Sequence, residues 1–123
     1  PVEIQAALFS RIVQFDRNFE DRSREGLVVG VLFQPDFPAS LAAKDEFSQM
    51  LPAADLTDGQ GRRPEIVEVQ WDKELGASME AAGVDLLYVA PLRGIDVSVI
   101  STESRRLGVL TISETVQSDL THD

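Results

Sequence analysis

Four short apolar runs, separated by stretches long enough for a helix, set the strongest limit on how this chain can fold. The runs are rich in β-branched residues and cover residues 27–33, 66–71, 85–90 and 108–112. Helical patterns lie around them, at about residues 4–19, 39–51, 73–82 and 95–107. Strands that alternate with helices predict βαβ crossovers. We therefore expect a three-layer α-β-α fold of the α/β class, with a mainly parallel sheet of four or more strands.

The composition of each run predicts its place in the sheet. Residues 27–33 and 84–90 are apolar on both faces, as the central strands of a parallel sheet are. Residues 65–71 alternate apolar side chains with charged ones, which is typical of an edge strand with one solvated face. We expect a single domain over residues 1–123. Because the polar stretch 113–123 contains no clear covering element, we also expect the C-terminal part of the domain to be missing.

Several residues predict where the helices begin and end. Pro52 is expected to end the second helix, and Asp72 is expected to cap the third, which Gly83 follows. The helix expected over residues 95–107 has an inward face made of Ile95, Val99 and Ile100.

The charge and composition exclude several classes of partner and site. The chain has 21 acidic and 11 basic residues, for a net charge of −10. Nucleic acid and anionic membrane surfaces bind proteins through clustered Lys and Arg, so we expect neither as a partner. No apolar run approaches the length of a membrane span, so insertion in a membrane is not expected either. The absence of cysteine excludes disulfides and thiolate chemistry.

Candidate ligand-binding residues are those that follow the strands, because parallel sheets bind ligands outside the carboxyl ends of their strands. These residues form a candidate crevice of Gln34, Asp36, Trp71, Asp72, Arg93 and Glu114. Arg93 is the one base among them and could hold a carboxylate or phosphate. The alternative is ordinary structural chemistry, in which Asp36 and Asp72 cap helices and Trp71 closes the edge of the core.

Catalytic signatures are missing from the sequence. It contains no G-x-G-x-x-G or G-x-x-x-x-G-K-[ST] phosphate loop, no G-x-S-x-G nucleophile motif and a single histidine, His122. We therefore expect no cofactor, no metal and no enzymatic activity. The weakest alternative is an enzyme that uses Asp36 and Asp72 as acid and base.

The order of the sequence blocks resembles the YfiR-like family. The resemblance is carried by the aliphatic and aromatic pattern of residues 4–15, the strand 27–33 followed by Phe37 and Leu41, and the blocks 83–90 and 108–114. It runs through essentially the whole chain. The sequence departs from the family in lacking cysteine, in the segment 15–19 that follows the first helix, and in ending before further strands.

This resemblance implies a periplasmic regulatory or sensory domain that binds protein. The partner that it implies is the periplasmic part of a membrane diguanylate cyclase or kinase, held in an inactive state. We expect the binding surface to include the crevice and the exposed part of the first helix, with Phe9, Arg11, Phe15 and Phe19. The alternative is a sensor that binds a small solute near Arg93 and Trp71. A homodimer is also an option, because an exposed sheet edge can pair with a second copy.

Overall fold

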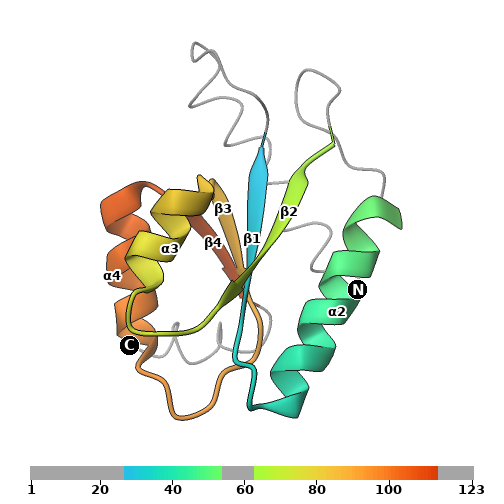
Figure 1. Ribbon diagram of the computed structural model, residues 1–123, viewed down its shortest axis with the longest axis horizontal. Coiled ribbons are helices and arrows are strands. Elements are labelled where there is room, and N and C mark those ends of the chain that lie inside the picture. The colour runs from blue at the N-terminus through green and yellow to red at the C-terminus, as the bar shows by residue number, and fades with distance from the viewer. Residues whose placement is uncertain (1–26, 54–62, 114–123) are drawn as a thin grey trace.

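The computed structural model describes residues 27–53 and 63–113, with side chains except at 51–53, and these residues form alternating strands and helices (Figure 1). In chain order the elements are β1 (Val28–Phe33), α2 (Pro38–Ala53), β2 (Glu65–Gln70), α3 (Leu75–Ala82), β3 (Leu86–Val89), α4 (Val97–Leu107) and β4 (Leu110–Ser113). The helix expected at residues 4–19 and most of the polar stretch 113–123 lie outside the described residues. None of the helices in the described ranges is long and apolar enough to cross a bilayer.

The four strands form one sheet in the order β2-β1-β3-β4, and every neighbouring pair is parallel. This confirms the expected α/β fold, with β1 and β3 in the centre and β2 at an edge. Gly30 marks the middle of β1, where a Cβ atom would lie only 3.0 Å from Cγ2 of Val84 and 3.2 Å from Cδ1 of Leu87. The missing side chain lets these two residues pack directly against β1.

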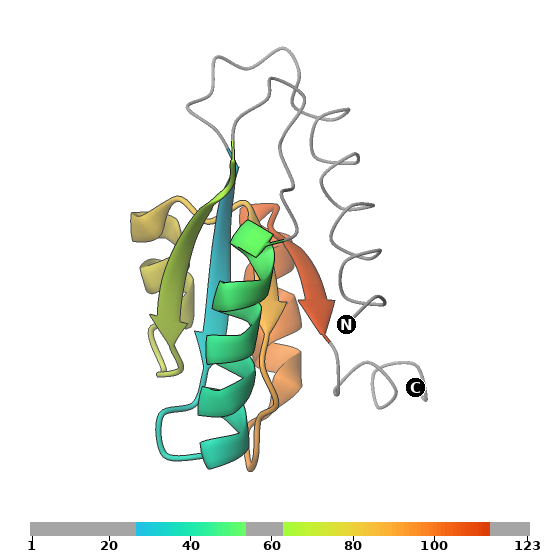
Figure 2. The same ribbon diagram turned by 90° about the vertical axis from the view of Figure 1, so that its right-hand side faces the viewer.

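The helices cover both faces of the sheet, which gives the three expected layers (Figure 2). The α2 side has a core built from alternate residues of β1 and β3, including Val31 and Tyr88. Phe47 of α2 completes it by stacking on Tyr88, with ring centroids 4.1 Å apart. Aromatic pairs of this kind add to the stabilisation that burial provides.

The opposite face of the sheet is covered by α3 and α4. Its core combines Met79 of α3 and Ile100 of α4 with strand residues such as Leu87. The two helices approach closely at Gly76, where a Cβ atom would overlap the Glu103 carboxylate. Glu103 in turn binds Arg106, with 2.8 Å between Oε1 and Nη2.

The helix boundaries differ in part from the sequence-based expectations. The helix expected to stop before Pro52 extends to Ala53. A proline in the last turn removes only one intrahelical hydrogen bond, so the helix can continue through Pro52 and end two residues later than expected. The helix expected from Lys73 begins at Leu75, because Asp72 first closes a turn with the backbone of Glu74. Gly83 follows this helix in the left-handed conformation, with φ of 69°, as expected.

The helix expected over residues 95–107 begins at Val97, and its inward face was wrongly predicted at Ile95 and Val99. Ile100 is buried, but Val99 is 40% exposed, and Ile95 precedes the helix and is half-buried. The face that packs on the core consists of Val97, Ile100, Ser104 and Leu107. These positions are spaced by three and four residues, so a helix that presents them must turn Val99 toward solvent.

Candidate functional site

The carboxyl end of the sheet has a topological switch point between β1 and β3. After β1 the chain turns to α2 on one face, and after β3 it turns to α4 on the opposite face (Figure 1). Connections that diverge in this way leave a crevice between them, which is where parallel sheets usually bind ligands. Residues 34–37 and 90–96 form the two loops at this switch point.

Gln34 joins these two loops with its side chain. Its Nε2 donates to the Arg93 carbonyl oxygen at 3.0 Å, and its Oε1 accepts from the Arg93 backbone N–H at 2.8 Å. We call this pair of hydrogen bonds the Gln34 clasp. The Gln34 backbone is itself held, because its N–H donates to Oγ of the fully buried Ser40 at 2.8 Å.

Arg93 therefore contributes to the site in two ways. Its backbone completes the clasp, and its guanidinium lies over the ring of Phe37, 5.4 Å from Cζ to the centroid. Such a cation–π contact orients the side chain while leaving its N–H donors available. No carboxylate in residues 27–53 and 63–113 forms an ion pair with Arg93, whose side chain is exposed.

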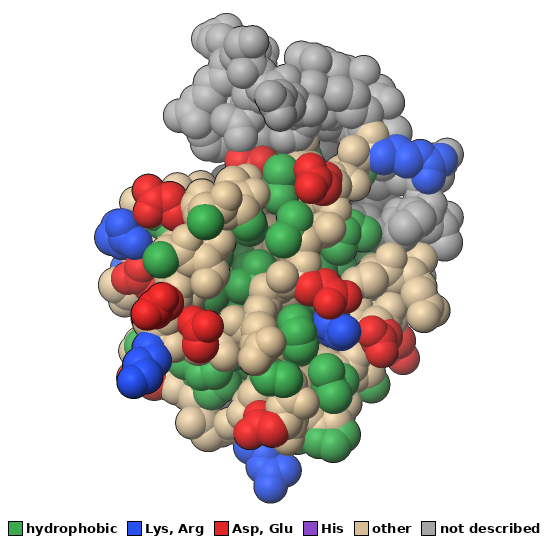
Figure 3. Space-filling model, viewed as in Figure 1, with side chains coloured by type: hydrophobic (Ala, Val, Ile, Leu, Met, Phe, Trp, Pro, Cys, Tyr) green, Lys and Arg blue, Asp and Glu red, His purple; other side chains and the backbone are tan. Residues whose placement is uncertain are grey.

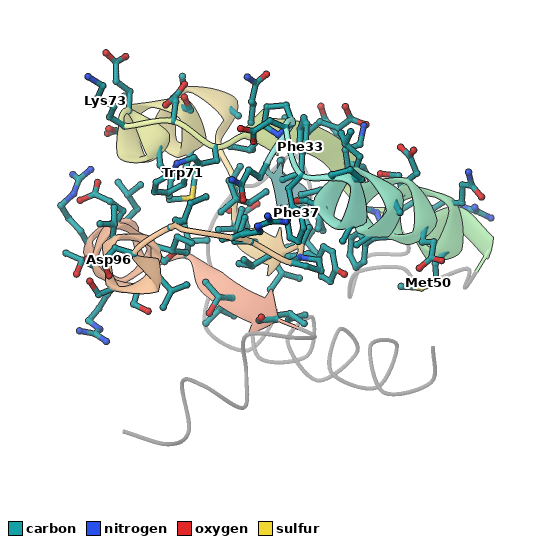
Figure 4. The ribbon with its side chains drawn as sticks, turned by 90° about the horizontal axis from the view of Figure 1, so that it is seen from below. Phe33, Phe37, Met50, Trp71, Lys73 and Asp96 are labelled. Carbon is teal, nitrogen blue, oxygen red and sulfur yellow. The ribbon has the colours of Figure 1, made fainter. Side chains whose placement is uncertain are left out.

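Trp71 lies on the other side of the sheet from the Arg93 guanidinium. It is half-buried and packs against the core beneath α3 and α4, and its backbone N–H donates to the Phe33 carbonyl at 2.8 Å. Figure 4 shows Trp71 between α3 and α4. Phe37, whose ring lies under the Arg93 guanidinium, is at the start of α2. The structure thus places Trp71 at the edge of the core and does not bring it together with Arg93.

The two candidate aspartates are both exposed. Oδ1 of Asp72 accepts from the Glu74 N–H at 2.8 Å and so organises the turn before α3. Asp36 lies in the turn between β1 and α2 and has no hydrogen-bond or ion-pair partner in the described part of the chain. Neither observation favours acid–base chemistry.

The remaining predicted residues lie outside the described ranges. They are Glu114 of the crevice and Phe9, Arg11, Phe15 and Phe19 of the first helix. Their assignment to a binding surface stays a prediction. Within the described ranges, no three or more Asp, Glu, His or Cys side chains are grouped so that they could hold a metal ion.

Sequence reasoning missed three residues that shape this end of the sheet. Phe37 supports Arg93, and buried Ser40 holds the Gln34 backbone. Asp96 caps α4 by accepting from the Ser98 N–H at 3.0 Å and from the Ser98 hydroxyl at 2.7 Å. These hydrogen bonds, the one from the hydroxyl first, lower the pKa of Asp96. The Asp-x-Ser pattern was a sequence signal for this cap, whereas Phe37 and Ser40 carried none.

Comparison with known proteins shows no relative of this chain. No model of a protein family matches the chain. Comparison with curated proteins and with solved structures gives no match either. The resemblance to the YfiR-like family stays a prediction from the sequence.

Proposed function

We propose that this chain is a non-enzymatic regulatory domain that acts by binding another protein. The observation that carries the proposal is the Gln34 clasp, which occupies the Arg93 N–H and one acceptor position of the Arg93 carbonyl, where a ligand would otherwise bind. A ligand that entered this crevice would have to break both hydrogen bonds and replace them. The site is better suited to bracing two loops than to holding a substrate.

The finer form of the proposal rests on the sequence resemblance. It is a periplasmic domain whose partner is the sensor region of a membrane diguanylate cyclase or kinase. Repression then requires tighter binding to the inactive state of the partner than to the active one. The net charge of −10 suits a partner with a basic surface.

A small-solute sensor is the second candidate, and the exposed guanidinium of Arg93 is the observation that favours it. This group is oriented by Phe37 and has no carboxylate partner among the described residues. A solute that carries a carboxylate or phosphate could bind Arg93 from outside the clasp without breaking it.

Native mass spectrometry of gently purified protein separates the two candidates. We expect the bare mass of the protein from the wild type. A small molecule of reproducible mass, lost in Arg93→Ala and kept in the matched control Arg105→Ala, would overturn the first candidate in favour of the sensor. Arg105 suits this purpose because it is exposed in the last turn of α4, whereas Arg93 precedes the first turn of this helix.

Affinity capture tests the protein partner directly. The purified domain is immobilised and exposed to solubilised membranes of the source cell, and captured proteins are identified by mass spectrometry. We expect to capture a membrane protein that has a sensor region. Excess free domain should displace this protein from the immobilised domain. If no protein is displaced by the free domain, the proposed function is wrong.

A further inference from the structure

The backbone N–H and C=O groups of β2 point alternately toward β1 and away from the sheet. Glu65 donates its N–H to the Leu27 carbonyl at 2.9 Å, and Trp71 donates to Phe33 at 2.8 Å, so the odd-numbered residues of this strand face β1. Because backbone groups alternate along a strand, the N–H and C=O groups of Ile66, Glu68 and Gln70 face away from the sheet. Within residues 27–53 and 63–113, β2 is the last strand at this side of the sheet, and no strand pairs with its outer edge.

The two sides of β2 have different chemistry. On the α2 side Ile66 packs against the core, and Glu68 is half exposed. On the α3 side Val69 is buried, and Val67 and Trp71 are half-buried. Figure 3 looks onto the β2 edge of the sheet and shows apolar side chains along its middle, with acidic and basic side chains around them.

The charge on the α2 side is negative overall. Lys44 lies 3.3 Å from Oδ1 of Asp45 and 3.5 Å from Oε2 of Glu68, so two carboxylates share one ammonium group. The Lys44 side chain is 14% exposed, whereas Asp45 and Glu68 are 63% and 50% exposed. An incoming basic side chain can therefore reach both carboxylates without displacing Lys44. The strand itself carries two glutamates and no base.

We propose that the outer edge of β2 binds an extended segment of the partner as a fifth strand, with Lys or Arg beside Glu68 and aliphatic residues beside Val67 and Val69. The inference rests on the proposed function and names the surface that performs it. Strand addition satisfies the outward backbone groups, and the two sides of β2 select the alternating basic and apolar pattern.

A second copy of the chain suits this edge poorly. Its β2 strand would bring a second Glu65 and a second Glu68 to this edge, one on each face of the sheet, and each chain carries a net charge of −10. Like charges on paired strands are destabilising. The charge that discourages self-pairing is the same charge that favours a basic segment.

The binding test uses a fluorescein-labelled nine-residue peptide of alternating lysine and valine, measured by anisotropy with the whole domain. A peptide methylated on alternate backbone nitrogens is the matched control and is expected not to bind. On binding, hydrogen exchange should slow at the amides of Ile66, Glu68 and Gln70 and stay unchanged at Val67 and Val69, which already bond to β1.

Two pairs of variants locate the peptide on β2. Gln70→Pro removes an outward N–H that β1 does not use, and should weaken binding about tenfold, while Gln70→Ala keeps this N–H and should bind as the wild type does. Glu68→Lys should weaken binding more than Glu80→Lys, which makes the same charge change on α3. Thermal melting of each variant establishes that it is folded.

The outcomes separate this inference from the proposed function. Absence of peptide binding at millimolar concentration, or equal binding by Gln70→Pro and Gln70→Ala, overturns the role of the β2 edge. A wild-type dimer that Gln70→Pro dissociates overturns it in favour of a second copy. If Gln70→Pro still captures the membrane partner, the proposed function stands and the partner binds another surface.

Discussion

The carboxyl end of the sheet and the outer edge of β2 treat their backbone groups in opposite ways. At the carboxyl end, side chains bind the backbone of the loops: Gln34 binds Arg93, Asp72 binds Glu74 and Asp96 binds Ser98. At the β2 edge, the outward groups of the strand have no partner among the described residues. Among the described residues, the region where parallel sheets usually bind ligands is the braced one, and the β2 edge is the one left unpaired.

Matched valine substitutions give the largest expected effect and test whether the edge is open. Val31 is fully buried in the centre of the sheet, whereas Val67 is half-buried on β2. Val31→Ala should lower the free energy of unfolding by about 2 to 3 kcal/mol, and Val67→Ala by less than about 1 kcal/mol. Urea unfolding measures both. Equal losses would mean that the β2 edge is covered in solution.

Removing the Gln34 clasp should have an intermediate effect. Gln34→Ala leaves the Arg93 N–H and carbonyl without their partners, so we expect a loss of about 1 kcal/mol and faster hydrogen exchange at Arg93. Gln49→Ala, at an exposed position of α2, is the control and should change stability little. An unchanged exchange rate at Arg93 would show that the clasp does not brace the two loops.

The cap of α4 should give the smallest effect, visible in its pH dependence. Hydrogen bonds from Ser98 lower the pKa of Asp96 in the folded state, so the ionised carboxylate stabilises the fold above about pH 4. This stabilisation is lost as the pH falls through the lowered pKa. The urea midpoint should therefore fall less between neutral and acidic pH in Asp96→Asn than in the wild type. The asparagine keeps an oxygen acceptor without the charge. Parallel pH profiles for the two proteins would contradict this role of the charge.

The strands were predictable because their signal is local. The apolar runs at 27–33 and 84–90 contain β1 and β3, and the alternating run at 65–71 contains the edge strand β2. The strand ends differ by one or two residues, as is usual where hydrogen bonding starts and stops.

The clasp could not be predicted because it depends on which strands are neighbours. Gln34 and Arg93 lie 59 residues apart and meet only because β1 and β3 are adjacent in the sheet. The exposure of Val99 could not be predicted because it depends on which residues of α4 face the sheet. A shift of one residue moves the apolar stripe by about 100° around the helix. The positions of Gln34 and Arg93 after their strands made both candidate site residues, but nothing in the sequence showed that they would bind each other.

The position of β1 in the sheet has a consequence for how the chain folds as it is made. β1 pairs with β2 through residues 65–70 and with β3 through residues 86–89, and both partners follow it along the chain. A ribosome must therefore add more than fifty residues after β1 before its second edge can pair. During that interval an apolar strand has an open side, and we expect the nascent chain to depend on chaperones until β3 emerges.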